Sequence, residues 1–474
     1  MMDLAILSLL PIILSGMRDA SGVLGDPDIW WHLADARILT DSHHFIHIEP
    51  YSYTVAGQRW VDPEWLSELP FWLGYRLFGL VGIYLCASLA LCANLYFIYW
   101  RSYLRARNQA VALWMTALSL ILMWVNAGAR TILFGYIILS IELGILEAAE
   151  RKKSWSLWLL PPLFSVWINL HGSWIIGLTF FAVYILCGLF RVNSGILHQE
   201  PFSRQYRTLL LGVFGACLLA LFVNPYGWRL IWNPFDMALN QKLNIADVQE
   251  WQPLNLEWFI GKAAVGFIVL VILVNVLRPR TWKIFEFAFL FMAWYAAFDH
   301  ARFTFLAAVV TVPAVAFDLA RGLFAPTADQ KTIPFMNGVV AAAVIGVVAL
   351  YFPRGDSLQK GLAANFPLQT IAMIELDWRV LNEEHIGGIM DFRSKPTFID
   401  TRWDTFEHHG VMRDYLGIIR LQGSLDLLDK YKIDHVLTQK GAPISYLLEH
   451  TLGWKILRTE GSGSKQYELF ARMH

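Results

Sequence analysis

Long runs of apolar residues, separated by short polar connections, fill most of the first 353 positions of the sequence. A membrane-spanning helix needs about 20 residues of this kind, and somewhat fewer where flanking aromatic residues help to match the bilayer. Runs of suitable length lie near 80–100, 110–126, 132–148, 155–169, 174–190, 208–223, 263–277, 284–298, 303–320 and 333–352. The pattern predicts a polytopic α-helical membrane protein.

The segment from Met1 to about Ser15 is a further, shorter apolar run. Its length suits a signal peptide, but signal peptides begin with basic residues, and here Asp3 stands instead. We predict an uncleaved first helix, with a cleaved signal peptide as the alternative. The chain then has about 11 transmembrane helices. Because this number is odd, the two ends of the chain lie on opposite sides of the membrane.

Lysine and arginine are unevenly distributed between the connections. Fourteen of them lie in the 50 residues of the even-numbered connections, 101–109, 149–154, 191–207, 278–283 and 321–332. Only nine lie in the 115 residues of the odd-numbered connections, 17–79, 127–131, 170–173, 224–262 and 299–302. Cytoplasmic loops are the ones enriched in these residues. We therefore predict a cytoplasmic N-terminus and an extracytoplasmic C-terminal segment.

From Arg354 onward the long apolar runs give way to shorter ones. Short apolar segments typical of strands alternate with helical segments: strands at 397–399, 435–437, 454–457 and 467–470, and helices at 411–421 and 424–431. We predict a small extracytoplasmic α/β domain at 354–474, following a transmembrane domain at 1–353. The first outer loop of the transmembrane domain is 17–79, and the end of this loop, at 62–79, has the spacing of an amphipathic helix lying on the membrane.

The composition agrees with a membrane protein, since 56% of the residues are hydrophobic and 16% are charged. A formal net charge of +0 argues against nucleic acid as a partner, because binding to the phosphate backbone requires an excess of Lys and Arg. The four cysteines lie within apolar runs and are expected to be packing residues. The sequence contains none of the phosphate-binding glycine loops or the zinc-protease and serine-hydrolase motifs, so nucleotide chemistry has no support.

The unusual polar motifs fall almost entirely in the predicted outer connections. They are Arg130 and the segments GDPDIWWH at 25–32, DPEW at 62–65, NLHG at 169–172, NPYG at 224–227, EWQP at 250–253 and DHAR at 299–302. Ionisable groups at the edge of a membrane are energetically unfavourable, and where they occur they usually have a function. These motifs are therefore candidates for one shared site. The alternative is that loops are polar in any protein and that Trp residues form an interfacial belt.

Sugar transfer from a phosphate leaving group requires a base near the acceptor and cations near the departing phosphate. Asp26 and Asp28 flank a proline in the first outer loop, and one of them is expected to be the general base. Asp28 and His32 are also candidate ligands for a divalent cation, Mg²⁺ or Mn²⁺. The alternative for Asp28 is an N-cap on the helix that follows.

Arg130 and Arg302 each lie at the outer end of a predicted span, where the phosphate of a lipid-linked donor would lie. Guanidinium groups bind phosphate bidentately, so both are expected to bind the donor, with snorkelling to lipid headgroups as the alternative.

His32 and His171 are expected to bind substrate, with packing in the protein interior as the alternative for each. Trp31 is expected to stack on sugar. Glu64 and Glu250, each followed by Trp, are expected to bind substrate or to serve as alternative bases.

The chain is predicted to have a first helix with a cytoplasmic N-terminus, a long acidic first outer loop with the DPDIWWH segment, a many-helix body and an outer C-terminal α/β domain. This organisation resembles the C-type glycosyltransferase superfamily, which includes oligosaccharyltransferases, protein O-mannosyltransferases and aminoarabinose transferases of lipid A. The closer resemblance is to a bacterial branch of these membrane proteins that shares DPDxWWHL, NLHG, NPYG and EWQP segments and a late stretch, here FIDTRWD at 398–404. The resemblance covers nearly the whole chain. It implies an inverting transfer, with or without a metal, by an aspartate of the first outer loop, which is Asp26 or Asp28 in this sequence.

We therefore expect a glycosyltransferase of the bacterial inner membrane. It would move a sugar from a polyprenyl-phosphate donor to a lipid, glycan or protein acceptor on the outer face, among membrane lipids. One alternative is a transporter or flippase of a lipid-linked saccharide, which would need polar groups deep in the membrane; Glu142 and Glu286 are the exceptions to otherwise apolar spans. A second alternative is a non-catalytic scaffold of a polysaccharide-assembly complex.

Overall fold

The structure is a computed structural model that describes residues 24–151, 154–322, 352–463 and 465–473, with a few isolated positions between 335 and 350. The predicted first helix lies outside the described residues. So does most of the predicted span at 333–352. The total of eleven spans therefore stays a prediction.

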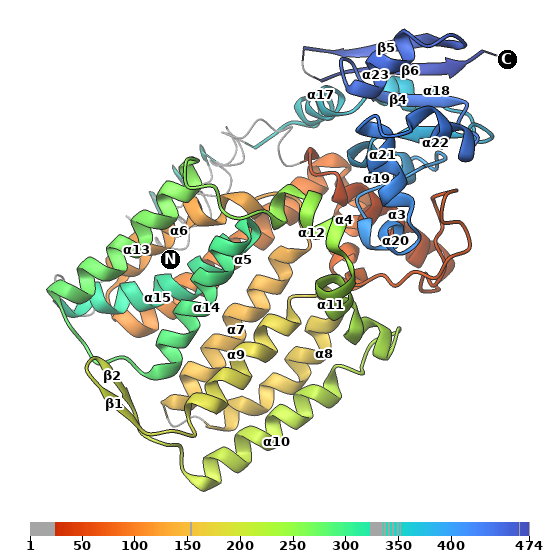
Figure 1. The fold of residues 1–474 in the computed structure, drawn as a ribbon. Coiled ribbons are helices and arrows are strands. Elements are labelled where there is room, and N and C mark those ends of the chain that lie inside the picture. The colour runs from red at the N-terminus through yellow and green to blue at the C-terminus, as the bar shows by residue number, and fades with distance from the viewer. Residues whose placement is uncertain are drawn as a thin grey trace.

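The body of the protein is a set of helices that lie side by side (Figure 1). They are α5 (Leu80–Ala106), α6 (Gln109–Met123) with η1 (Trp124–Asn126), α7 (Ile132–Glu150), η2 (Ser154–Leu159), α8 (Leu160–Leu170), α9 (Trp174–Cys187), α10 (Arg204–Ala220), α13 (Phe259–Leu277), α14 (Ile284–Asp299) and α15 (Thr304–Gly322). Each predicted span between 80 and 320 coincides with one of these helices. Among the described residues, five helical segments are long and apolar enough to cross a bilayer. The chain is a multi-pass membrane protein.

Burial separates the inner helices of this body from the outer ones. In the segment that contains α15, 83% of the apolar window is buried, whereas in α13 only 22% is buried. Small residues of α15 such as Ala307 and Ala308 are fully enclosed, which allows neighbouring helices to approach closely. The helix α15 therefore forms the centre of the bundle, and α13 presents most of its apolar surface outward.

The first outer connection carries two helices, α3 (Asp28–Ser42) and α4 (Trp65–Phe78). The predicted helix at the end of this connection is thus present and begins at Trp65. It packs tightly on α5 where two glycines meet: a side chain on Gly82 would place its Cβ 1.8 Å from the carbonyl oxygen of Gly74. The first half of α3 is buried, so this helix is part of the protein core and not a surface loop.

Shorter elements complete the connections between the membrane helices. They are the hairpin of β1 (Val192–Ser194) and β2 (Leu197–Gln199), the helices α11 (Trp228–Asn240) and α12 (Lys242–Asp247), and the single turns η3 (Gln249–Trp251) and η4 (Ala301–Phe303). The turns η3 and η4 lie at the same end of the bundle as α3 and hold Glu250 and Arg302.

The C-terminal segment combines a four-stranded sheet with short helices. Its elements are α17 (Gly355–Asn365), α18 (Leu368–Met373), β3 (Val380–Asn382), α19 (Glu384–Phe392), α20 (Trp403–His408), α21 (Val411–Ile419), α22 (Ser424–Lys430), β4 (His435–Gln439), α23 (Pro443–Glu449), β5 (Trp454–Ser462) and β6 (Lys465–Arg472). The strand order is β3-β4-β6-β5, with β3 parallel to β4 and the other pairs antiparallel. Figure 1 shows this sheet at one end of the helical body, beyond α3. The division into two domains stays a prediction.

One predicted strand of this segment is wrong. Residues 397–399 form only an isolated bridge, between Thr397 and Ser52 of the first outer connection. The side chain of Asn382 takes the place of a strand partner: it accepts from the amide of Phe398 at 2.8 Å and donates to the carbonyl of Ile399 at 2.7 Å. The segment has an apolar pattern because it is buried, although it is not a strand of the sheet.

Candidate active site

The site lies where the first turn of α3 meets the connections that precede α7 and α13. Asp26, just before α3, forms an ion pair with Arg130, and Arg130 forms a second ion pair with Glu250 of η3. Ion pairs thus connect three segments that are far apart in the sequence. The polar motifs that contain these three residues meet at one place, as predicted.

Arg130 is held by its two carboxylate partners. Although burial disfavours its charge, Asp26 and Glu250 raise the pKa of Arg130 above its usual range. Burial opposes ionisation of Glu250 as well, but Arg130 and Arg302 together lower the pKa of Glu250 below its usual value. Because two carboxylates already neutralise this guanidinium, Arg130 orients the site more than it offers a free charge for a phosphate.

Asp28 is the first residue of α3, and the N-cap is Pro27, with no side-chain capping bond. The alternative in which Asp28 is the N-cap is therefore wrong. Its backbone amide donates to Asp26 Oδ1 at 3.2 Å, so the side chain of Asp26 satisfies the first amide of the helix. Burial, followed by the charge of Asp26, raises the pKa of Asp28 to about 7, while Arg130 and a hydrogen bond from Thr401 oppose this rise.

The carboxyl group of Asp28 has the properties of a general base. It is only half-buried, and it forms no ion pair with any residue that the structure describes. The Thr401 hydroxyl that contacts it also accepts from the indole N–H of Trp31 at 3.2 Å, which orients the hydroxyl. A base works best when its pKa lies near the operating pH, as it does here.

Two histidines and a glutamate form a second group beside Asp28. His171 Nδ1 accepts from the amide of Ser173 at 2.9 Å, so its other nitrogen carries the proton and points to Glu64 Oε1 at 3.2 Å. Glu64 also accepts from the hydroxyl of Thr131 and lies 3.5 Å from His32 Nε2. Burial raises the pKa of Glu64 to about 8.

Both imidazoles are neutral near physiological pH. Burial, with a contribution from Arg302, lowers the pKa of His171 to about 3. Burial, with contributions from His171 and Arg402, lowers the pKa of His32 well below its usual value. Neither ring offers a positive charge to a phosphate, but both lie against Glu64, which accepts a hydrogen bond from the hydroxyl of Thr131.

Arg302 is the available cation of the site. Its guanidinium lies 4.2 Å above the ring of Trp251, and it forms no ion pair in the described ranges. Its backbone carbonyl accepts from the side-chain amide of Asn126 at 2.9 Å and from the hydroxyl of Tyr136 at 3.3 Å, so its position is fixed from two helices. The ring contact holds this guanidinium beside η3, and snorkelling to lipid headgroups stays the alternative.

The predicted role of Trp31 in sugar stacking does not fit its position. Its ring is only 7% exposed and lies 3.6 Å from the ring of His32, so neither face is open to a ligand. The predicted metal pair of Asp28 and His32 is also not supported by geometry, because the two nitrogens of His32 face Glu64 and Glu68. No group of three potential ligands that includes Asp28 or His32 occurs in the described part of the chain.

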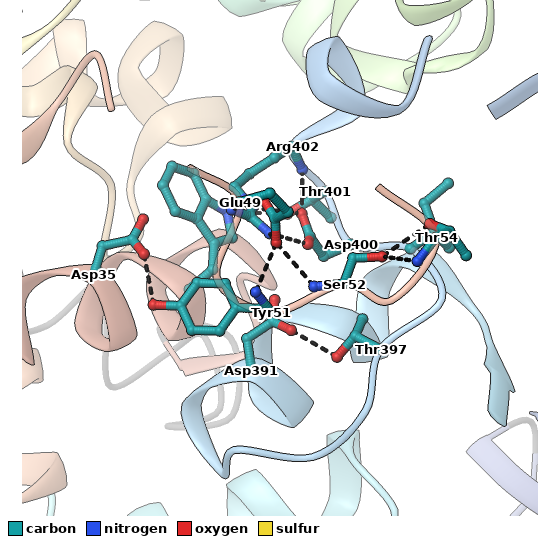
Figure 2. Close-up of polar contacts among 12 residues, drawn as sticks. Asp35, Glu49, Tyr51, Ser52, Thr54, Asp391, Thr397, Asp400, Thr401 and Arg402 are labelled. Carbon is teal, nitrogen blue, oxygen red and sulfur yellow. Dashed lines mark hydrogen bonds and ion pairs between the residues drawn. The ribbon is translucent and has the colours of Figure 1, made fainter. Parts of the chain in front are cut away.

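The FIDTRWD stretch reaches the site through a buried ion-pair cluster, shown in Figure 2. The guanidinium of Arg402 donates to Glu49 at 2.8 and 3.0 Å and to Asp400 at 2.9 and 2.6 Å. Glu49 in turn accepts from the amides of Tyr51 and Ser52. This cluster, which we call the Arg402 cluster, ties the first outer connection to the C-terminal segment and so places Thr401 beside Asp28.

Glycines on α19 make the same junction possible. A side chain at Gly388 would place its Cβ 2.5 Å from the carbonyl oxygen of Pro27, and one at Gly387 would place it 2.5 Å from the Cα of Asp400. Only glycine permits α19 to approach both the start of α3 and the FIDTRWD stretch.

Several residues of the site were not predicted from the sequence. Thr401 lies inside a stretch that was singled out without an assigned role, and Thr131 follows the predicted Arg130 directly. Asp62 lies in the DPEW segment that was singled out without a role for this residue, and Glu68 is distinguished from a solvated loop carboxylate only by its convergence with Asp35 and Asp62 in space.

Known proteins resemble this chain in structure but not in sequence. No family model and no curated protein matches the chain. Among solved structures, ArnT from Cupriavidus metallidurans bound to undecaprenyl phosphate is similar over 97% of this chain and 97% of its own, with 14% identity and a TM-score of 0.51. The apo state of the same protein is similar over 94% and 93%, with 14% identity and a TM-score of 0.53.

The apo form of the Archaeoglobus fulgidus oligosaccharyltransferase is similar over 92% of this chain and 69% of its own, with 10% identity and a TM-score of 0.54. The chain has the fold of the C-type glycosyltransferases. The expectation drawn from the DPDIWWHL, NLHG, NPYG and EWQP segments is thus confirmed for the fold. The similarity to ArnT extends over almost the full length of both chains.

Proposed function

We propose that this protein transfers a sugar from a polyprenyl-phosphate donor to a lipid, glycan or protein acceptor on the outer face of the bacterial inner membrane. The observation that carries the proposal is that both Asp28, a half-buried carboxyl group, and Arg302, a guanidinium, act on Glu64 of the site, while neither forms an ion pair in the described residues. Both lie on a C-type fold, and one solved structure with that fold holds undecaprenyl phosphate.

The proposed step is a direct displacement at the anomeric carbon. Asp28 accepts the proton of an acceptor hydroxyl as the oxygen of that hydroxyl attacks the anomeric carbon from the face opposite the phosphate. The bond between the anomeric carbon and the phosphate oxygen breaks, and polyprenyl phosphate leaves with the electron pair. Arg302 stabilises the negative charge on the departing phosphate. The configuration at the anomeric carbon is inverted.

Glu64, Glu250 and Arg130 have supporting roles in this scheme. Arg130 holds Asp26 and Glu250 around the start of α3 by an ion pair with each. Glu64, whose pKa burial raises to about 8, is suited to hydrogen-bonding a sugar hydroxyl, and His171 lies against it at 3.2 Å.

Replacing Arg302 with Gln should raise the KM for the lipid-linked donor by about 10- to 100-fold, because a hydrogen bond to a charged group contributes about 1.5–3 kcal/mol. The kcat should fall as well, because the same guanidinium stabilises the charge that develops on the departing phosphate. The matched control is Arg229→Gln, which alters an exposed arginine of α11. Steady-state kinetics in membranes at varied donor concentration measures both, and an unchanged KM for Arg302→Gln would remove the assigned phosphate contact.

The rate should also depend on pH through Asp28. A base must be deprotonated to act, and the pKa of Asp28 is raised to about 7 by burial. The kcat/KM should therefore fall about tenfold for each pH unit below 7 and level off above it. The residual activity of Asp28→Asn should lose this dependence. A wild-type profile that stays flat between about pH 5.5 and 8 would show that the base titrates elsewhere.

A further inference from the structure

Three carboxylates converge in the protein interior between α3 and α4, next to the candidate active site. Asp35 lies on α3, Asp62 precedes α4 and Glu68 lies on α4, and their exposed fractions are 0%, 3% and 0%. One oxygen of each carboxylate lies within 4.8 Å of an oxygen of the other two. Within the described residues, this is the one group of three potential metal ligands that comes so close.

No positive charge is paired with these carboxylates. In the described ranges none of the three forms an ion pair with Lys or Arg; Glu68 contacts the ring of His32 at 2.8 Å and the side chain of Asp62. The nearby guanidinium of Arg402 is already occupied by Glu49 and Asp400.

The hydrogen bonds that reach the three groups leave oxygens free. Asp35 Oδ1 accepts from the hydroxyl of Tyr51 at 2.6 Å, a contact that Figure 2 shows. Asp62 Oδ1 accepts from the amide of Glu64 at 3.0 Å. Asp35 Oδ2 and Glu68 Oε2 are fully buried and have no hydrogen-bond partner in the described part of the chain.

Buried ionised groups are found paired or coordinated to metals, because an isolated charge in the interior is strongly unfavourable. We propose that Asp35, Asp62 and Glu68 bind a divalent cation. Carboxylate oxygens are the ligands that Mg²⁺, Mn²⁺ and Ca²⁺ prefer. Their metal–oxygen distances, about 2.0–2.6 Å, fit a cation placed among three oxygens that lie this close together.

The ion would connect the two helices that carry the site residues. The helix α3 begins at Asp28, and Glu64 is the N-cap of α4. A cation shared by Asp35 and Glu68 would fix the separation and orientation of these helices. It would therefore act by positioning Asp28 and Glu64, and its binding does not depend on the proposed transferase activity.

The metal content of the purified full-length protein tests the proposal. After equilibration with Mn²⁺ and removal of unbound metal, elemental mass spectrometry should find about one Mn²⁺ per chain. Asp35→Asn and Glu68→Gln should each weaken Mn²⁺ binding by at least about tenfold, as measured by electron paramagnetic resonance of free Mn²⁺. The control Asp41→Asn removes an exposed carboxylate of the same helix and should bind Mn²⁺ as the wild type does.

Two further results decide between this site and others. Asp28→Asn should keep its Mn²⁺ even if it loses transferase activity, which separates the two proposals. Added Mn²⁺ should raise the Tm of the wild type and not that of Asp35→Asn. Wild-type protein with neither bound metal nor a Mn²⁺-dependent Tm would show that protons neutralise the three carboxylates. Loss of the ion in Asp28→Asn would place the metal elsewhere. Either result overturns the proposal.

Discussion

Replacing Asp28 with Asn should reduce the rate of sugar transfer by about 10²- to 10⁴-fold, the range that general bases contribute. The amide has nearly the shape of the carboxylate and can still accept the hydrogen bond from Thr401, but it cannot take a proton from the acceptor. The fold should therefore survive while the chemistry is lost. Initial rates in membranes at saturating donor measure this effect, with Asp41→Asn as the control for a neutral replacement on α3.

The same assay decides between the two aspartates of the first outer connection. Asp26 is occupied by Arg130 and by the amide of Asp28, so Asp26→Asn should disturb the arrangement of the site and cause a smaller loss of rate than Asp28→Asn. An inactive Asp26→Asn protein together with a fully active Asp28→Asn protein would show that the base has been assigned to the wrong residue.

Replacing Arg402 with Gln should lower the free energy of unfolding by about 3–5 kcal/mol, because it leaves buried carboxylates without their counter-charge. Glu49 and Asp400 are both 0% exposed in their side chains and depend on this one guanidinium. The change should also detach the FIDTRWD stretch from the first outer connection, and with it Thr401. Chemical denaturation of the detergent-solubilised protein, monitored by circular dichroism, measures the loss.

The control for this stability prediction is Arg413→Gln on α21, where the arginine is exposed. Surface substitutions of this kind usually change stability by no more than about 0.5 kcal/mol. A loss below about 1 kcal/mol for Arg402→Gln would contradict the structural role given to the Arg402 cluster.

The helices of the membrane body could be predicted because their signal is local. The run at 132–148 is mostly apolar and long enough to cross a bilayer, and it became α7 with nearly the same bounds. The helix at the end of the first outer connection was also visible in the spacing of its apolar residues. The strand predicted at 397–399 failed because a short buried segment has the same composition whether or not it joins a sheet.

The site could be predicted as a set of segments but not as a set of contacts. Arg130 was expected to bind phosphate, and the structure instead places it between Asp26 and Glu250. The preference for Asp28 over Asp26 follows from which of them Arg130 neutralises. That contact joins residues about 100 positions apart, which no local pattern specifies.

The most direct measurement of the central claim is mass spectrometry of polyprenyl-phosphate lipids and their glycosylated products in cells where Asp28→Asn replaces the wild-type chain. The account predicts that a sugar-linked polyprenyl phosphate accumulates and a glycosylated product disappears, as in cells that lack the protein. Cells with Asp41→Asn should resemble the wild type. Wild-type levels of donor and product in Asp28→Asn cells would contradict the account.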